Sequence, residues 1–419
     1  MYNKVENAYR SASKNYSEIG VDTDAALEKL AEINLTLQCW QGDDVRGFEI
    51  QNTPLGGGLL ATGAYPGRAR TPTELRVDLE KAMSLIPGKK RINIHASYGE
   101  YFGNVDRDEI EPEHFKGWIE WAKHTGVKLD FNATLFSHPK AEAGFTLSCK
   151  DKETRRFWVE HVKRSRGIAA YIGAQQDSPC IHNLWIPDGM KDQCVDKLGY
   201  RSLLKESLDE IYSVRYDAKL IKDSVESKLF GLGSESFVVG SHEFYIGYAL
   251  SRDIMICLDM GHYHPTEFIA DKLSSLLQFF PEICIHVSRG VRWDSDHIPI
   301  LDDQLIDVAV EIVRCKALEK VYIALDYFDS SINRVGAWVA GARATQKALL
   351  LSLLEPTKIL KEMEERGDYT GRLAWLEEMK GLPLNAIYDH FSFENGVPVG
   401  ISWLKEVRSF ENETQLKRN

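Results

Sequence analysis

The sequence has few of the features that mark secreted, membrane-bound or nucleic-acid-binding proteins. Its seven cysteines are odd in number, scattered, and form no Cys-x-x-Cys pair, which argues against a disulfide framework and a thiolate zinc site. No window reaches the about 18 apolar residues of a membrane span, and the polar N-terminus lacks the apolar core of a signal peptide. No basic block is long enough to follow a phosphate backbone. We therefore expect a cytoplasmic protein that binds neither nucleic acid nor a membrane.

The composition is that of an ordinary globular protein. Hydrophobic residues make up 43%, charged residues 27%, and the net charge is −11. A chain of 419 residues exceeds the roughly 250–300 at which a single core stops growing. Its length suits a barrel of about 250 residues with an appendage, or two ordinary domains.

Eight short apolar runs rich in β-branched residues alternate with segments of helical period. The runs cover residues 35–40, 91–98, 128–134, 181–187, 223–230, 254–262, 282–288 and 321–328. Helical period is found over residues 73–85, 112–124, 152–165, 266–280 and 303–317. A strand followed by a helix, repeated eight times, predicts a parallel (β/α)8 TIM barrel.

We expect this α/β barrel, with an N-terminal helix, to occupy residues 1–330. The remaining residues, 331–419, lack strand partners and are expected to form a C-terminal α-helical extension. Its predicted helices cover residues 334–354, 356–366, 369–380 and 403–417.

Potential metal ligands stand at the carboxyl ends of the last four predicted strands, where such barrels build their active sites. They are Glu226, Asp259, His262, His286, Asp294, Asp296 and Asp326. Carboxylate oxygens with one imidazole suit Mg²⁺ and Mn²⁺, and the set is too large for a single ion. Taken singly, each histidine has an ordinary interpretation as a core residue, and each aspartate as a helix cap or turn residue.

The order of these ligands predicts two neighbouring metal sites. A closed site would take one ligand from each of four adjacent strands: Glu226, Asp259, His286 and Asp326. An open site, with positions left for substrate, would take Asp259, His262, Asp294 and Asp296, so that Asp259 bridges the two. Asp294 and Asp296 are expected in a loop. Gly261 is expected to turn the chain at positive φ after the strand.

Other side chains at the strand ends are candidates for sugar contact and proton transfer. Lys228 follows Glu226 by two residues on the same strand face, where it could act on a substrate oxygen or pair with Glu226. We take Lys228, Asp294, Asp296 and His262 as catalytic candidates. Substrate-binding candidates are Trp185, His95, Phe328 and Trp40, although most aromatic residues simply belong to the core.

The segment Gly56–Arg70 follows the first predicted strand and is rich in glycine. It matches neither Gly-x-Gly-x-x-Gly nor Gly-x-x-x-x-Gly-Lys-[Ser/Thr], so it is not a phosphate-binding loop of those kinds. It is either an ordinary surface loop or a mobile lid over the site.

Several long motifs resemble the L-rhamnose isomerase family, within the xylose-isomerase-like barrels. They lie at residues 39–45, 61–63 with 65–67, 185–192, 225–231, 292–297 and 324–334. The resemblance runs nearly end to end. It implies conversion of L-rhamnose to L-rhamnulose, two Mn²⁺ per subunit with Co²⁺, Mg²⁺ or Zn²⁺ tolerated, and a homotetramer. By position, Glu226, Asp259, His286 and Asp326 match the family's structural-metal ligands, and Asp259, His262, Asp294 and Asp296 match its catalytic-metal set.

The expected reaction moves hydrogen between C1 and C2 of an aldose to give a 2-ketose. It is redox-neutral, so it needs no cofactor beyond metal. The residues are compatible both with direct hydride migration and with a cis-enediol route. Alternatives are an isomerase of L-mannose, L-lyxose or D-allose type, a two-metal hydrolase on the same barrel, and a non-catalytic sugar-binding protein.

Overall fold

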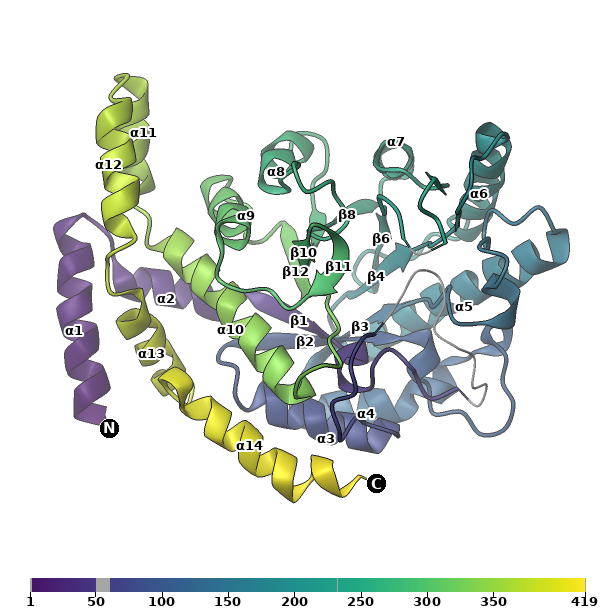
Figure 1. Cartoon of the computed structure of the whole chain (residues 1–419), viewed down its shortest axis with the longest axis horizontal. Helices are drawn as coiled ribbons and strands as arrows, with labels where there is room; N and C mark the ends of the chain where they lie inside the picture. Colours follow the sequence, from purple (N-terminus) through teal and green to yellow (C-terminus); the bar gives the residue numbers. More distant parts are fainter. Residues whose placement is uncertain (1, 50–60, 232, 419) are drawn as a thin grey trace.

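The computed structural model describes residues 2–49, 61–231 and 233–418, without the side chains of residues 2 and 293–295. Its centre is a sheet of eight parallel strands, each within or overlapping one of the eight predicted runs (Figure 1). They are β1 (Asn34–Gln38), β2 (Lys89–His95), β3 (Lys128–Asn132), β4 (Cys180–Trp185), β6 (Ile221–Glu226), β8 (Met255–Asp259), β9 (Ile283–Val287) and β12 (Val321–Leu325). The predicted barrel class is confirmed.

The strand order is β3-β2-β1-β12-β9-β8-β6-β4, so β3 and β4 are the two ends of the sheet. Side chains of β3 bridge this seam. The backbone N–H of Ile181 donates to Asp130 Oδ1 at 2.9 Å, and that of Asn183 donates to Asn132 Oδ1 at 3.1 Å. These bonds give β4 donors the partners that a backbone ladder would otherwise supply, and the barrel closes.

A helix follows each strand and packs around the barrel. These helices are α3 (Pro72–Met83), α4 (Lys116–Thr125), α5 (Lys152–Gln176), α6 (Lys197–Ile211), α7 (His242–Arg252), α8 (Ala270–Leu276), α9 (Asp303–Arg314) and α10 (Arg334–Leu353). Local signals set several ends: the Thr71 hydroxyl accepts from the Glu74 N–H before Pro72, and Gly126 ends α4 at φ 73°. Helix α8 is shorter than the predicted 266–280, and α5 is longer than 152–165.

The helix α10 packs against α9 and α3, beside β1. It follows the last strand and takes the place of the eighth barrel helix, because its apolar residues cover the sheet between those neighbours. We therefore propose that the extension begins after Leu353 rather than at residue 331.

The extension wraps the barrel along one side. It contains α11 (Thr357–Glu365), α12 (Tyr369–Met379), α13 (Leu384–Glu394) and α14 (Trp403–Glu413). At the N-terminus, α1 (Tyr2–Glu18) packs on α13 and α2 (Thr23–Glu32) packs on α10. The α11–α12 hairpin projects away from the barrel, and α14 brings the C-terminus back toward α3 (Figure 1).

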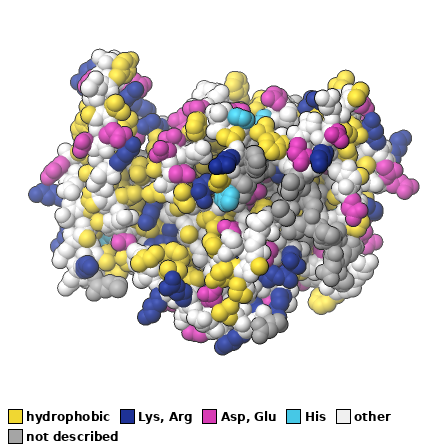
Figure 2. All heavy atoms as spheres, viewed as in Figure 1, with side chains coloured by type: hydrophobic (Ala, Val, Ile, Leu, Met, Phe, Trp, Pro, Cys, Tyr) yellow, Lys and Arg dark blue, Asp and Glu magenta, His cyan; other side chains and the backbone are white. Residues whose placement is uncertain are grey.

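Two small antiparallel ribbons lie beyond the strand ends. One pairs β10 (Arg289–Val291) with β11 (Trp293–His297), and the other pairs β5 (Gly189–Met190) with β7 (Phe237–Val238). Asp294 and Asp296 therefore lie on a hairpin strand and not in the loop that was expected. Among the described residues, no helix combines the length and apolar character needed to cross a bilayer. Acidic and basic side chains are interspersed on the face shown in Figure 2.

Candidate metal and sugar site

A pocket opens at the carboxyl ends of the barrel strands, and most of the predicted site residues line it. Those that line it are Trp40, His95, Trp185, Glu226, Lys228, His262, His286, Asp296, Asp326 and Phe328. Asp259 is buried beside them at the end of β8. The side chain of Asp294 lies outside the described part of the chain.

Four of the predicted ligands converge at the floor of the pocket. Glu226, Asp259, His286 and Asp326 are all buried, and one ligand atom from each lies within 4.8 Å of the others. The register of the strands causes this convergence, since Asp259 is paired with His286 across β8 and β9. His286 Nδ1 lies 2.8 Å from Asp326 Oδ2, 3.2 Å from Glu226 Oε2 and 3.6 Å from Asp259 Oδ2.

Several polar atoms of this cluster are buried without a hydrogen-bond partner. They include Asp259 Oδ2, Asp326 Oδ1 and His286 Nδ1, whose short contacts to the carboxylates lack hydrogen-bond geometry. Unsatisfied buried polar groups are costly unless something in the site compensates them. Two carboxylate oxygens and an imidazole nitrogen aimed at one point fit a divalent cation.

The electrostatics of the cluster indicate the same need for positive charge. Burial raises the pKa of Asp326 to about 6, although His286 opposes the shift. Burial also works against ionised Glu226, but His286 and His262 outweigh it and lower the pKa of that carboxyl. Burial disfavours the charged imidazole of His286, yet the acidic groups around it hold its pKa well above the usual range. One imidazole thus shares a buried site with three carboxyl groups, and a cation bound there would balance the carboxylates.

A second group of ligands adjoins the first. Asp259, His262 and Asp296 bring one ligand atom each within 4.8 Å of the others, so Asp259 belongs to both groups. His262 Nδ1 lies 2.9 Å from the Ser227 carbonyl oxygen and 3.0 Å from Glu226 Oε1, a contact that the sequence did not predict.

The role expected of Gly261 differs from what the structure shows. Gly261 is not among the glycines with positive φ. Its N–H donates to Asp259 Oδ1 at 2.6 Å, and a Cβ there would come within 2.9 Å of Ser288 Oγ. The hydroxyl of Ser288 also donates to Asp259 Oδ1, at 2.8 Å. Close approach, rather than backbone handedness, requires glycine here.

Aromatic rings form the upper wall of the pocket. Trp40 stacks on His95 with ring centroids 4.3 Å apart and meets Phe328 edge-on at 5.8 Å. Across the pocket, Lys228 Nζ lies 4.7 Å from the centroid of the Trp185 ring. An apolar wall beside carboxylates and an ammonium group suits a sugar, which offers both C–H faces and hydroxyls.

Four lining residues are not among the predicted site residues: Asn132, Ala133, Phe136 and Asn183. Phe136 lies beyond the end of β3 and packs 5.7 Å from Trp185. Asn183 lies within β4, and its side-chain amide donates to Glu226 Oε2. An alternating pattern along β4 could have assigned Asn183 to the barrel interior with Trp185, whereas Phe136 carries no periodic signal.

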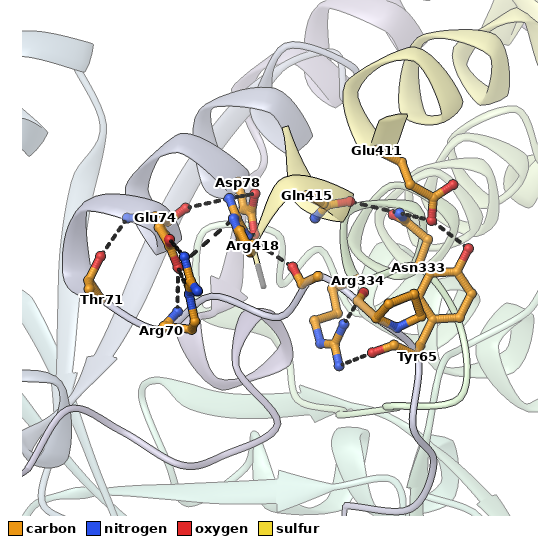
Figure 3. A network of polar contacts seen from close by, with 12 residues as sticks. Tyr65, Arg70, Thr71, Glu74, Asp78, Asn333, Arg334, Glu411, Gln415 and Arg418 are labelled. Carbon is orange, nitrogen blue, oxygen red and sulfur yellow. Dashed lines mark hydrogen bonds and ion pairs between the residues drawn. The ribbon is translucent and has the colours of Figure 1, made fainter. Parts of the chain in front are cut away.

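The segment Gly56–Arg70 is only partly described, and residues 61–70 are anchored rather than free. Arg334 donates to the carbonyl oxygens of residues 65 and 66 at 2.9 and 3.0 Å, and Arg418 donates to that of residue 67 at 3.0 Å (Figure 3). The hydroxyl of Tyr65 donates to Glu411 of α14. The C-terminal extension therefore contacts this part of the segment. Whether the segment is a lid or a surface loop stays a prediction, because its residues 56–60 lie outside the described part of the chain.

Fold and pocket together define a (β/α)8-barrel enzyme whose pocket suits a small polar substrate and holds candidate ligands for divalent metal ions. A family model described as L-rhamnose isomerase (RhaA) matches residues 3–418. The L-rhamnose isomerase of Rhodopirellula baltica is 53% identical over 415 residues, which cover 99% of this chain and 97% of that protein. Those of Listeria monocytogenes serotype 4a and Pectobacterium carotovorum are each 52% identical; the first match covers 99% of both chains and the second 100%. The chain belongs to the L-rhamnose isomerase family.

Proposed function

We propose that this chain interconverts L-rhamnose and L-rhamnulose with the help of divalent metal ions. The observation that carries the proposal is the convergence of Glu226, Asp259, His286 and Asp326 at the floor of an aromatic-walled pocket. Full-length similarity to proteins named L-rhamnose isomerase supports the choice of substrate.

The residues of this chain have distinct tasks in that reaction. Glu226, Asp259, His286 and Asp326 would hold one ion, and Asp259, His262 and Asp296, together with Asp294, would hold a second. When bound, such an ion supplies a Lewis acid that polarises the sugar carbonyl.

The remaining lining groups would orient the sugar. Lys228 is buried, and its ammonium lies at the pocket wall, where it can donate a hydrogen bond or a proton to a sugar oxygen. Trp40, Trp185 and Phe328 would cover the C–H face and the methyl group of a 6-deoxy sugar and exclude water from the reacting carbons.

We extend the proposal to two Mn²⁺ per subunit, with Co²⁺, Mg²⁺ or Zn²⁺ as substitutes, a homotetramer, and a location in the cytoplasm. The two adjoining ligand groups support the number of ions. All seven cysteines are free thiols, which suits a reducing compartment.

The test is a ketose assay on the full chain loaded with Mn²⁺ and given L-rhamnose, L-mannose, L-lyxose and D-allose. We expect turnover to be fastest with L-rhamnose. Asp296→Asn should abolish it, whereas Asp271→Asn, on the exposed side of α8, should leave it intact. The proposal would be contradicted if no sugar gave ketose, or if the chain hydrolysed phosphate esters instead of isomerising sugars.

A further inference from the structure

Two cysteines face each other in the barrel interior directly below the carboxylate cluster. Cys257 on β8 and Cys284 on β9 are register partners, two residues before the Asp259–His286 pair along both strands. Both thiols are buried, and they pack with Ile181, Met255 and Tyr322. The spacing of the cysteines along the chain gave no sign of this pair, because they lie 27 positions apart and only the strand register brings them together.

The imidazole of His286 completes a set of three donors. One ligand atom from each of Cys257, Cys284 and His286 lies within 4.8 Å of the others. A small rearrangement would bring these donors to the roughly 2.0–2.3 Å bonds that Zn²⁺ makes with nitrogen and sulfur. Two sulfurs and one nitrogen favour soft or borderline cations, in contrast to the oxygen-rich cluster above them.

We propose that Cys257, Cys284 and His286 form a binding site for a thiophilic divalent cation such as Zn²⁺ or Cd²⁺. Binding deprotonates the two thiols and releases their protons to solvent, so that two thiolates balance the charge of the ion. Because His286 also belongs to the carboxylate cluster, occupation of the thiol site withdraws a ligand from that cluster. A soft cation therefore competes with a hard one without taking the same position.

The route to this site passes through the pocket. His286 and Glu226 line the pocket floor, and Glu226 is the register partner of Cys257 across β6 and β8. An ion that reaches Glu226 is thus beside Cys257 on the neighbouring strand. The inference depends on the thiols and the imidazole, and it stands whether or not the chain isomerises L-rhamnose.

The test titrates the metal-free full chain with Cd²⁺ and follows the ultraviolet charge-transfer absorption from thiolate to Cd²⁺. We expect one thiolate-bound Cd²⁺ per chain. Cys257→Ser and Cys284→Ser should each weaken that binding by about 100-fold or more. The matched control is Cys315→Ser, at the half-buried end of α9, which should bind Cd²⁺ like the parent chain.

A second measurement needs no variant. Adding Cd²⁺ to the Mn²⁺-loaded chain should release Mn²⁺, detected by its electron paramagnetic resonance signal, as the thiolate absorption grows. The ¹¹³Cd chemical shift should show sulfur ligands. Cadmium bound with oxygen ligands only, or charge-transfer absorption that is undiminished in Cys257→Ser, would overturn the proposal. None of these readouts uses turnover, so failure here is distinct from failure of the proposed function.

Discussion

The second-to-last residue of the chain should contribute several kcal/mol to its stability. Arg418 donates to both carboxylate oxygens of Asp78, at 2.6 and 2.7 Å, and also to the carbonyl oxygen of Gly67 (Figure 3). The side chain of Arg418 is 5% exposed, and that of Asp78 is 0% exposed. Replacing Arg418 by Met would leave the carboxyl of Asp78 buried in α3 without its cation.

Removing one partner of a buried ion pair costs about 3–5 kcal/mol. An unfolding entropy of about 2.1 cal/mol/K per residue amounts to about 0.9 kcal/mol/K for a chain of 419 residues. We therefore expect Arg418→Met to lower Tm by about 3–6 °C. An effect of this size would report the burial of this particular pair.

Thermal unfolding followed by circular dichroism measures the shift. The matched control is Arg372→Met, because Arg372 pairs with Glu364 on the α11–α12 hairpin, where the two side chains are 34% and 61% exposed. That pair is worth about 0–1 kcal/mol, so Tm should change by about 1 °C or less. The double variant Asp78→Asn/Arg418→Met should recover much of the loss, because it removes the unpaired charge.

The destabilisation by Arg418→Met should depend on pH in a definite direction. Burial raises the pKa of Asp78 and Arg418 opposes that shift, so the folded-state pKa should rise further in Arg418→Met. The penalty should be full at neutral pH and shrink as falling pH protonates the carboxyl in the folded state. A Tm shift below about 1 °C, or a penalty that grows toward acid pH, would refute this reasoning.

Three further predictions concern the candidate metal ligands and a second buried carboxyl group, that of Asp43. Chelation should abolish turnover and lower Tm, and Mn²⁺ should restore both; an unchanged Tm would argue against the four-strand cluster. His262→Ala should lower kcat while one ion stays bound, whereas His286→Ala should lower stability and metal content, and equal loss of metal in both would contradict the two-site division. Burial raises the pKa of Asp43 to about 7, so this carboxyl costs stability as pH rises from its unfolded value near 4 through 7. Unfolding midpoints of Asp43→Asn should lack that decline, and a constant difference from the parent chain between pH 5 and 8 would contradict it.

Much of the barrel could be predicted from the sequence, because its signals are local. Each strand is a short run rich in β-branched residues between helical segments. The apolar pattern that marks such a run lies within the run itself and does not depend on distant residues. The pocket residues could be predicted for the same reason: parallel strands end at one face, so Glu226, Asp259, His286 and Asp326 had to meet there once the barrel was assumed. The helical period predicted over residues 73–85 also located α3, within two residues at each end.

What only the tertiary structure decided are the contacts between segments that are far apart in the chain. Helical period identifies α10 as a helix but not as the eighth helix of the barrel. No local pattern pairs Arg418 with Asp78, 340 residues earlier. Spacing rules consider cysteines close in sequence, whereas strand register places Cys257 opposite Cys284. Gly261 lies in the turn that the sequence predicted, but its φ is not positive, and only the packed structure shows how close Ser288 lies to it. The hydrophobic pattern of each segment predicts which of its side chains are buried. The register between strands and the packing of helices are fixed only when all segments come together.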